Sequence, residues 1–253
     1  MSDGVRGAGG AGELRRLQVH IGPSARMGDA TFIPAPANEI PRLLSDLEKF
    51  IHSDSEIPAL LRLAMIHYQF ESIHPFHDGN GRIGRLLISL LLASEKILPQ
   101  PLLYLSAFFE RHRPEYYENL LHVSTRGSWN EWFLYFLEAV RDQSLDAITT
   151  ANRLSDLRDD CHARLHMPRA TGLLHKLVDS LFGNPALTVS QAARLLSVTY
   201  RAAQQNVDRL VESGILREVT GRKRNRIFIS DEIIRAVEGQ ERDESHRRQQ
   251  KIH

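Results

Sequence analysis

Cysteine is almost absent from this sequence. The chain of 253 residues has one cysteine, Cys161, which has no partner for an intramolecular disulfide, so a disulfide-stabilised secreted scaffold is excluded. An excess of charge of one sign is lacking as well, because 32 Lys and Arg face 31 Asp and Glu. The net charge of +1 gives no overall attraction to nucleic acid or to an anionic membrane, although it allows a local basic patch.

The sequence also lacks a long hydrophobic run and a targeting signal. Its most apolar stretch, residues 83–98, is shorter than a membrane span and contains Arg85, Glu95 and Lys96. Residues 1–12 are rich in Gly and Ala, have no apolar signal segment, and are predicted to be flexible. We therefore expect a cytoplasmic protein without a membrane partner. The 42% of apolar residues suffices for a core, and the length allows one large domain or two ordinary ones.

Helical periodicity dominates the first two thirds of the chain. Asn38 predicts the start of the first helix, and Pro58 is suited to an early position in the second, which is apolar on most sides. Helices are predicted over residues 38–52, 58–70, 80–97, 102–112, 114–123 and 129–165. A domain joint is expected at residues 167–170, where Pro168 lies.

Two regions depart from this helical pattern. At residues 17–36, two short alternating runs flank a turn-rich stretch and predict a small β-hairpin or flap. Beyond the joint, helices are predicted over residues 173–181, 188–196 and 199–213, followed by two strands within 215–230. This order predicts a winged helix-turn-helix over residues 170–235, with a charged tail at 236–253.

One segment, residues 74–85, concentrates polar groups and glycines directly before a predicted buried helix. Gly79 and Gly81 flank Asn80 and allow a tight turn, so the backbone N–H groups at the start of the helix form a nest for an anion. Arg82 and Arg85 lie on one helical face and are suited to phosphate oxygens.

Two further groups in this segment have chemical potential. Asp78 is a hard oxygen ligand of the kind that binds Mg²⁺ together with substrate phosphates. His74 precedes the loop and can act as a general base near neutral pH. The combination indicates a nucleotide-phosphate site with a base beside it.

Other interpretations of the segment explain less of it. Gly79, Gly81 and Gly84 fit G-x-G-x-x-G, as do Gly7, Gly9 and Gly12, but neither set follows a strand in a β-α-β unit, and a Walker A lysine is absent. A histidine–aspartate metal cluster of His67, His74, His77 and Asp78 leaves the residues from Gly79 onward without a role. The remaining alternative is a capped loop whose arginines form surface ion pairs.

The segment matches every fixed position of the Fic-domain signature, H-x-F-x-[D/E]-G-N-G-R-x-x-R. The matching residues are His74, Phe76, Asp78, Gly79, Asn80, Gly81, Arg82 and Arg85. The chain therefore resembles the Fic/DOC family over residues 13–166. The resemblance implies a mainly α fold, with a Fic helical core and a small β-hairpin flap, followed by a winged helix-turn-helix domain as in many bacterial members.

The resemblance further implies transfer of AMP from ATP to a Tyr, Thr or Ser hydroxyl of a target protein, and to the chain itself. By this analogy His74 takes the hydroxyl proton while the hydroxyl attacks the α-phosphate, and Asp78 holds Mg²⁺. The implied ATP and phosphate site comprises Asp78, Gly79, Asn80, Gly81, Arg82, Ile83, Gly84 and Arg85. Phe76 is expected to anchor the loop in the core.

The same resemblance assigns the walls of the nucleotide site. Its flap residues would be Val19, His20, Ile21 and Gly22, which would also align the target chain. Tyr116, Tyr117 and Ser124 would border the adenosine, with core packing as the alternative for the two tyrosines.

Fic proteins are commonly inhibited by a helix with the pattern [S/T]-x-x-x-E-[G/N], whose glutamate pairs with the second arginine of the signature, here Arg85. Glu118-Asn119 and Glu238-Gly239 have the final dipeptide, but neither has Ser or Thr four residues before the glutamate. The expectation is that the inhibitory helix is missing through an N-terminal truncation or is supplied by a partner, and that this form lacks self-inhibition.

Basic residues are concentrated locally in the predicted winged helix-turn-helix. Its expected DNA contacts are Arg201, Gln205, Arg209, Arg222, Lys223 and Arg224. A protein-interaction or dimerisation unit, including a homodimer, is the alternative for this module. Three alternatives remain for the whole chain: a DNA-binding regulator with a nucleotide-sensing Fic domain, transfer of another phosphate-containing group, and removal of AMP.

Overall fold

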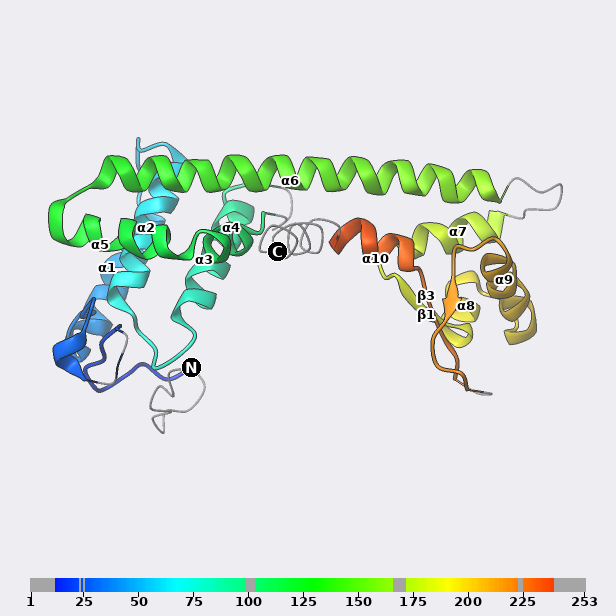
Figure 1. The fold of residues 1–253 in the computed structure, drawn as a ribbon, viewed down its shortest axis with the longest axis horizontal. Helices are drawn as coiled ribbons and strands as arrows, with labels where there is room; N and C mark the ends of the chain where they lie inside the picture. The colour runs from blue at the N-terminus through cyan, green and yellow to red at the C-terminus, as the bar shows by residue number, and fades with distance from the viewer. Residues whose placement is uncertain are drawn as a thin grey trace, which may run out of the picture. The chain divides into compact units, whose positions relative to one another are not determined.

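The computed structural model describes residues 12–22, 24, 26–98, 103–165, 172–222 and 225–238 (Figure 1). Its chain divides into two compact units, Met1–Leu145 and Asp146–His253, which are described separately. The predicted flexible N-terminus at 1–12 and the charged tail at 236–253 lie largely outside the described residues. Within the described ranges, no helix is long and apolar enough to span a membrane.

The N-terminal unit is helical. Its elements are η1 (Met27–Asp29), η2 (Ala37–Glu39), α1 (Ile40–His52), α2 (Ala59–Ile73), α3 (Asn80–Ser94), α4 (Leu105–Arg111), α5 (Arg113–Arg126) and the first half of α6 (Trp129–Arg164). These helices lie where the periodicity predicts them. The predicted cap at Asn38 is wrong, because Asn38 lies in the 3-10 turn η2 after Pro36 and α1 begins at Ile40.

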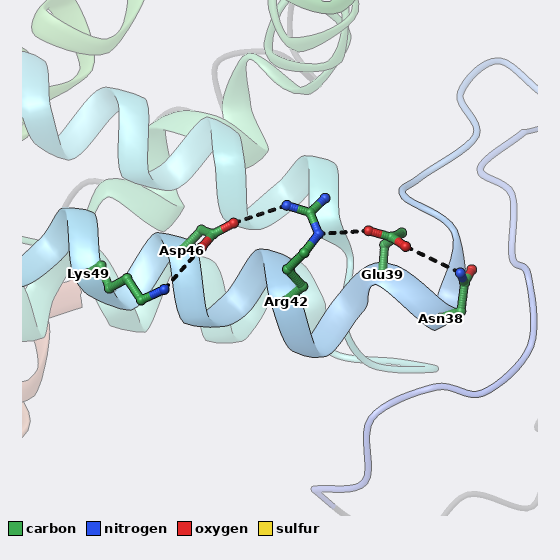
Figure 2. A network of polar contacts seen from close by, with 5 residues as sticks. All are labelled: Asn38, Glu39, Arg42, Asp46 and Lys49. Atoms are coloured by element: carbon green, nitrogen blue, oxygen red, sulfur yellow. Dashed lines mark hydrogen bonds and ion pairs between the residues drawn. The ribbon is translucent and has the colours of Figure 1, made fainter.

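Polar side chains mark the solvent face of α1 and the turn before it (Figure 2). Arg42 donates from Nε to Glu39 Oε2 at 2.8 Å and from Nη1 to Asp46 Oδ2 at 3.1 Å, and Lys49 lies 3.4 Å from Asp46 Oδ1. Asn38 donates to the other oxygen of Glu39 at 3.3 Å. Because all these side chains are exposed, each pair contributes little stability, and the opposite face of α1 faces the core.

The core of this unit forms around α2, which packs against α1 and α3 (Figure 1). Leu63 and Trp132 are both fully buried, and Trp132 donates its indole N–H to the backbone carbonyl of Ala64 at 3.0 Å. This confirms the prediction that the second helix, which is apolar on most sides, is buried. The polar residues at its C-terminal end are therefore presented from a rigid element.

The predicted hairpin at residues 17–36 is much reduced. Ile21 and Phe32 form one isolated antiparallel bridge, with backbone bonds of 2.9 and 3.0 Å, and no longer strand is present among the described residues of this stretch. The intervening turn contains η1, which interrupts any ladder. A second bridge joins Leu14 to Phe76 and connects the segment before the flap to the loop after α2.

The C-terminal unit combines helices with a small sheet. It contains the second half of α6, α7 (Gly172–Leu181), β1 (Ala186–Thr188), α8 (Val189–Leu196), α9 (Tyr200–Glu212), β2 (Arg217–Glu218), β3 (Ile227–Ile229) and α10 (Asp231–Glu238). The strands form an antiparallel sheet in the order β1-β3-β2. This is the predicted winged helix-turn-helix, with β1 as an additional strand that the helical pattern from Thr188 onward concealed.

Local sequence explains where the helix-turn-helix begins. Thr188 caps α8 through a capping box, in which its hydroxyl accepts from Gln191 N–H and the Gln191 side chain accepts from Thr188 N–H. The second half of α6 also belongs to this core, because Cys161 and Leu165 pack with α7 and α8 residues. This packed unit therefore begins before the joint predicted at residues 167–170.

Candidate functional site

The site begins at the C-terminal end of α2. His74 caps this helix in the left-handed conformation, with φ 51° and ψ 60°, and its N–H donates to Phe70 at 3.0 Å. Only glycine adopts this region without strain, and a following proline further disfavours helical backbone. His74 precedes Pro75 and is therefore held in a strained conformation at the position predicted for the base.

The loop between His74 and α3 is closed by Asn80. Its side chain is 2% exposed, accepts the N–H of Phe76 at Oδ1 and donates from Nδ2 to the Phe76 carbonyl, both at 2.8 Å. Both polar groups of the Asn80 side chain therefore shape the loop, and the assignment of Asn80 to the phosphate site stays a prediction. Gly79, with φ 85°, provides the left-handed turn into α3.

The first turn of α3 presents its backbone N–H groups without helical acceptors, as every helix N-terminus does. The first α-helical bond of this end runs from Ile83 N–H to the Gly79 carbonyl at 3.0 Å, so the N–H groups of residues 80–82 precede it. These groups and the positive end of the helix dipole suit an anion. An anion at this end of α3 stays a prediction, with the N–H groups of residues 80–82 as its donors.

The two arginines of the segment lie in different environments. Arg82 is 76% exposed and lies 3.5 Å from Asp78, whose side chain is 95% exposed. Arg85 is only 16% exposed, donates from Nε to Ser106 Oγ at 3.0 Å, and lies 3.8 Å from Glu110. The prediction that Arg82 and Arg85 act together from one face of the helix is thus only partly met, because the Arg85 side chain is held against α4.

Glu110 is an acidic partner of Arg85 that the pattern search missed. Ser106 and Glu110 lie one helical turn apart on α4 and both contact the Arg85 side chain. The sequence has the expected Ser-x-x-x-Glu spacing at this point, but Arg111 replaces the final Gly or Asn. The search for the full inhibitory signature, which required that final residue, therefore did not find Glu110.

Glu71 is a second carboxyl group that sequence reasoning left without a role. Burial raises the pKa of Glu71 to about 7, even though the neighbouring Arg85 lowers it. Its Oε1 atom has no hydrogen-bond partner among the described residues. A Cβ at Gly81 would lie 3.0 Å from Arg85 Nη1 and 3.9 Å from Glu71 Oε1, so both groups lie over the first turn of α3.

His67 is structural. It is fully buried, contacts the Tyr116 hydroxyl through Nε2 at 2.9 Å, and stacks on Phe109. Burial lowers the pKa of His67 to about 3, so it is neutral at physiological pH. Within the described residues, no group of three His, Cys, Asp or Glu could hold a metal ion, so the alternative metal cluster does not assemble.

A cavity of about 450 Å³ lies between the flap, the C-terminal end of α2, and α5. Its lining residues are Ile21, Gly22, Thr31, Phe32, Glu71, Ser72, Tyr117, Leu120 and Leu121. The structure thus brings the predicted residues Ile21, Gly22 and Tyr117 to one cavity whose walls are mostly apolar.

The other predicted wall residues lie elsewhere. Tyr116 is 3% exposed and packs in the core, as the alternative for the tyrosines proposed. Ser124 pairs with the Tyr68 hydroxyl at 2.9 Å, and His20 contacts the backbone carbonyl of Ser24 at 3.0 Å. Val19 is not among the lining residues of this cavity. Tertiary packing therefore separates Tyr117 from its neighbour Tyr116.

The C-terminal unit offers a separate candidate surface. Arg201, Gln205 and Arg209 are exposed along α9, and Arg222 is exposed at the start of the wing. Lys223 and Arg224 lie outside the described residues. Asp208 is exposed on the same helix, so the basic character of α9 is strongest towards its N-terminal half.

Two family models match this chain, one within the N-terminal unit and one within the C-terminal unit. Residues 3–92 match the model of the Fic/DOC family, and residues 174–228 match that of an HTH DNA-binding domain. Residues 3–92 are therefore similar to the Fic/DOC family, and residues 174–228 are similar to an HTH DNA-binding domain.

Curated relatives match over part of their length. A probable protein adenylyltransferase of Aquifex aeolicus is 35% identical over 69 residues, which are 27% of this chain and 22% of that protein. The protein adenylyltransferase Fic of Culex quinquefasciatus is 31% identical over 137 residues, which are 53% of this chain and 24% of that protein. This chain thus covers less than a quarter of the length of either relative.

A solved structure shares the fold. The crystal structure of a Fic family protein from Desulfovibrio desulfuricans G20 is similar with a TM-score of 0.51 at 22% sequence identity. The match covers 89% of this chain and 64% of that one.

Gly84 provides a test of the packing under the site. A Cβ at this position would lie 2.5 Å from Glu71 Oε1 and 3.1 Å from a Phe70 ring carbon. We expect Gly84→Ala to destabilise the N-terminal unit by about 1–2 kcal/mol, because overpacking outweighs the gain in helix propensity. Urea unfolding followed by tryptophan fluorescence measures this, since Trp129 and Trp132 are the two tryptophans and both lie in this unit.

Gly28→Ala is the matched control for this measurement. A Cβ at Gly28 would meet no atom within 4 Å. If Gly84→Ala were as stable as Gly28→Ala, the close approach of α2 and α3 at Gly84 would not be a packing constraint.

Proposed function

We propose that this protein is a protein adenylyltransferase that transfers AMP from ATP to a Tyr, Thr or Ser hydroxyl of a target protein, and to itself. The observation that carries the proposal is the joint placement of His74 at the end of α2 and the anion-binding first turn of α3, joined by the loop that Asn80 closes. The names of the curated relatives support the same activity.

His74 is suited to the role of general base. Burial lowers the pKa of His74 to about 4, and the positive charge of Arg15 acts in the same direction. The imidazole is therefore neutral at pH 7 and can accept a proton. In the proposed step the target hydroxyl loses its proton to His74 while its oxygen forms a bond to the α-phosphorus of ATP, and the bond to pyrophosphate breaks.

The start of α3 would stabilise the phosphates. The N–H groups of residues 80–82 lie where negative charge is best tolerated, and Arg82 extends into solvent beside them. Arg85 would neutralise the outer phosphates after leaving Glu110, with which it forms a partly exposed ion pair. We propose that Glu110 competes with the nucleotide for Arg85 and so restrains binding.

Asp78 fits the Mg²⁺ that such a reaction requires. Its carboxylate is 95% exposed at the rim of the loop, and its oxygens contact the Gly79 N–H and the flexible Arg82 side chain. Carboxylate and substrate phosphate oxygens are the ligands Mg²⁺ prefers. When bound, the ion would neutralise phosphate charge, and Asp78 is the residue that would hold it.

The cavity between the flap, α2 and α5 would take the adenosine. Its volume of about 450 Å³ is in the usual range for small-molecule sites, and its walls are largely apolar. Tyr117 is 46% exposed and lines this cavity from α5, while Ile21 and Gly22 line it from the flap. Since ATP is abundant in the cytoplasm, we also propose a cytoplasmic location.

His74→Ala tests the proposed base. Incubation with ATP labelled at the α-phosphate and with lysate proteins should show at least a ~100-fold loss of transfer, since a general base contributes at least this much. ATP affinity should change by less than about threefold, because the phosphate site is left intact. His77→Ala, an exposed neighbour in the same loop, is the control and should retain transfer.

The result distinguishes the alternatives for this chain. Label on no protein with the wild-type chain would contradict transfer and favour a nucleotide-sensing regulator. Release of AMP from a modified protein, or transfer of label from another position of the nucleotide, would favour the other two chemistries.

Asp78→Ala tests the proposed metal ligand. The variant should bind ATP equally with and without Mg²⁺, whereas the wild type should bind more tightly as Mg²⁺ is added, because the carboxylate holds the ion next to the phosphates. Calorimetric titration measures both affinities. Asp54→Ala, at an exposed position on the loop after α1, is the control and should respond to Mg²⁺ as the wild type does. An unchanged Mg²⁺ response in Asp78→Ala would refute the assignment.

DNA binding is a second proposed function, carried by the exposed basic residues of α9 and supported by the match to an HTH DNA-binding domain. We expect the full chain to shift duplex DNA at low salt. Arg201→Ala should weaken binding and lower the slope of log K against log salt by about 1, since one phosphate contact is lost.

Arg235→Ala, an exposed arginine on α10, is the control for this measurement. Equal loss of binding in both variants would indicate general charge attraction. Absence of any shift at low salt would favour a protein-interaction or dimerisation module.

A further inference from the structure

Arg15 is a buried arginine without a carboxylate partner among the described residues. It is 1% exposed, and its guanidinium donates to four backbone carbonyls. A buried charge is strongly unfavourable unless its donors are satisfied, and an arginine remains protonated even in such a place. The carbonyls around Arg15 are thus held in position by the requirement to satisfy it.

The four acceptors belong to two different parts of the site. On one side, Nε donates to the carbonyl of His74 at 2.8 Å and Nη2 donates to that of Ile73 at 3.2 Å. On the other side, Nη1 donates to Leu17 at 3.0 Å and Nη2 donates to Ala35, at the two ends of the flap. One side chain therefore connects the residue proposed as base to both ends of the flap.

The main chain of Arg15 strengthens the same connection. Its N–H donates to the Pro75 carbonyl at 2.9 Å, next to the bridge between Leu14 and Phe76. Three consecutive carbonyls, those of residues 73–75, are thus bonded to Arg15. They include the last carbonyls of α2, which have no helical donors and carry the negative end of the helix dipole.

This contact lies where the backbone is strained. His74 is left-handed and precedes a proline, a combination that persists only when the surroundings enforce it. The bond from Arg15 Nε to the His74 carbonyl restrains the peptide group that follows this strained residue. Removing the bond would allow His74 to relax towards an extended conformation and carry its imidazole away from the start of α3.

We propose that Arg15 is a positioning residue, whose guanidinium holds the His74 carbonyl and both ends of the flap in one hydrogen-bonded set. The flap wall and the base are assembled together, because neither can move away without leaving donors of a buried cation unsatisfied. The catalytic consequence of this assembly rests on the proposed adenylyl transfer, but the assembly itself does not.

The charge of Arg15 gives a signature that packing alone would not. Among the described residues, Arg15 is the charged side chain that shifts the pKa of His74, and it lowers that pKa together with burial. Glu71 acts in the opposite direction through its backbone carbonyl. Replacing Arg15 by an uncharged residue should therefore raise the pKa of His74, whereas Arg15→Lys should leave it nearly unchanged.

The test compares Arg15→Met, Arg15→Lys and the control Arg16→Met in the full chain, since Arg16 is the exposed neighbour of Arg15. Backbone hydrogen exchange by mass spectrometry measures the flap and the loop at residues 74–79. Exchange at the imidazole C2 position measures the pKa of His74 without any activity. Labelled ATP measures kcat and KM.

For Arg15→Met we expect backbone exchange to rise at least ~10-fold in the flap and the loop together, because bonds to a charged group are lost. The pKa of His74 should rise, and kcat should fall by ~100-fold with a smaller change in KM. In Arg15→Lys the pKa of His74 should stay at its wild-type value. Backbone exchange in the flap and the loop should rise less than in Arg15→Met, and kcat should fall less. Arg16→Met should behave as the wild type.

Two outcomes overturn the proposal. One is an Arg15→Met protein in which His74 has its wild-type pKa and only the flap exchanges faster. The other is an Arg15→Lys protein with wild-type kcat and with wild-type backbone exchange in both the flap and the loop. This second outcome decides the question if Arg15→Met does not fold. If the wild type transfers no AMP, the proposed function fails, while exchange and the His74 pKa still decide the role of Arg15.

Discussion

The close approach of α2 and α3 at Gly84 is the constraint on which the rest of the site depends. A side chain of any size at this position would collide with Glu71, Phe70 and His67 of the facing helix. Residues 74–79 join these two helices and reverse the direction of the chain. The left-handed backbone of His74 and of Gly79 makes this reversal, and the side chain of Asn80 closes it.

The same approach determines the charges around the proposed nucleotide site. Burying Glu71 against α3 raises its pKa and leaves one of its oxygens without a hydrogen-bond partner among the described residues. Arg85 occupies the space beside it and is turned towards Ser106 and Glu110 on α4. Arg85, which we propose binds the outer phosphates, is thus engaged by the protein itself, while Arg82 extends into solvent.

Much of the fold and the centre of the site could be predicted because their signals are local. Apolar periodicity located α2, α3 and α6, and turn residues located the helix-turn-helix. The loop from His74 to Arg85 was recognisable since its residues are contiguous and its glycines and polar groups have few other uses. The structure of the flap was harder to predict from the sequence. Its single bridge between Ile21 and Phe32 does not require the alternation of apolar and polar residues that marks a strand.

The sequence by itself determined the class of fold, the two kinds of domain, and the loop that carries His74 and Asp78. Tertiary structure decided what each side chain does. It assigned Asn80 to the loop, Tyr116 to the core and Tyr117 to the cavity, and it brought Glu110 to Arg85. It also joined Arg15 to the carbonyl of His74, although the two are far apart in the chain. The physical reason is that periodicity and turn chemistry are properties of neighbouring residues, whereas burial and hydrogen-bond partners depend on which segments the folded chain brings together.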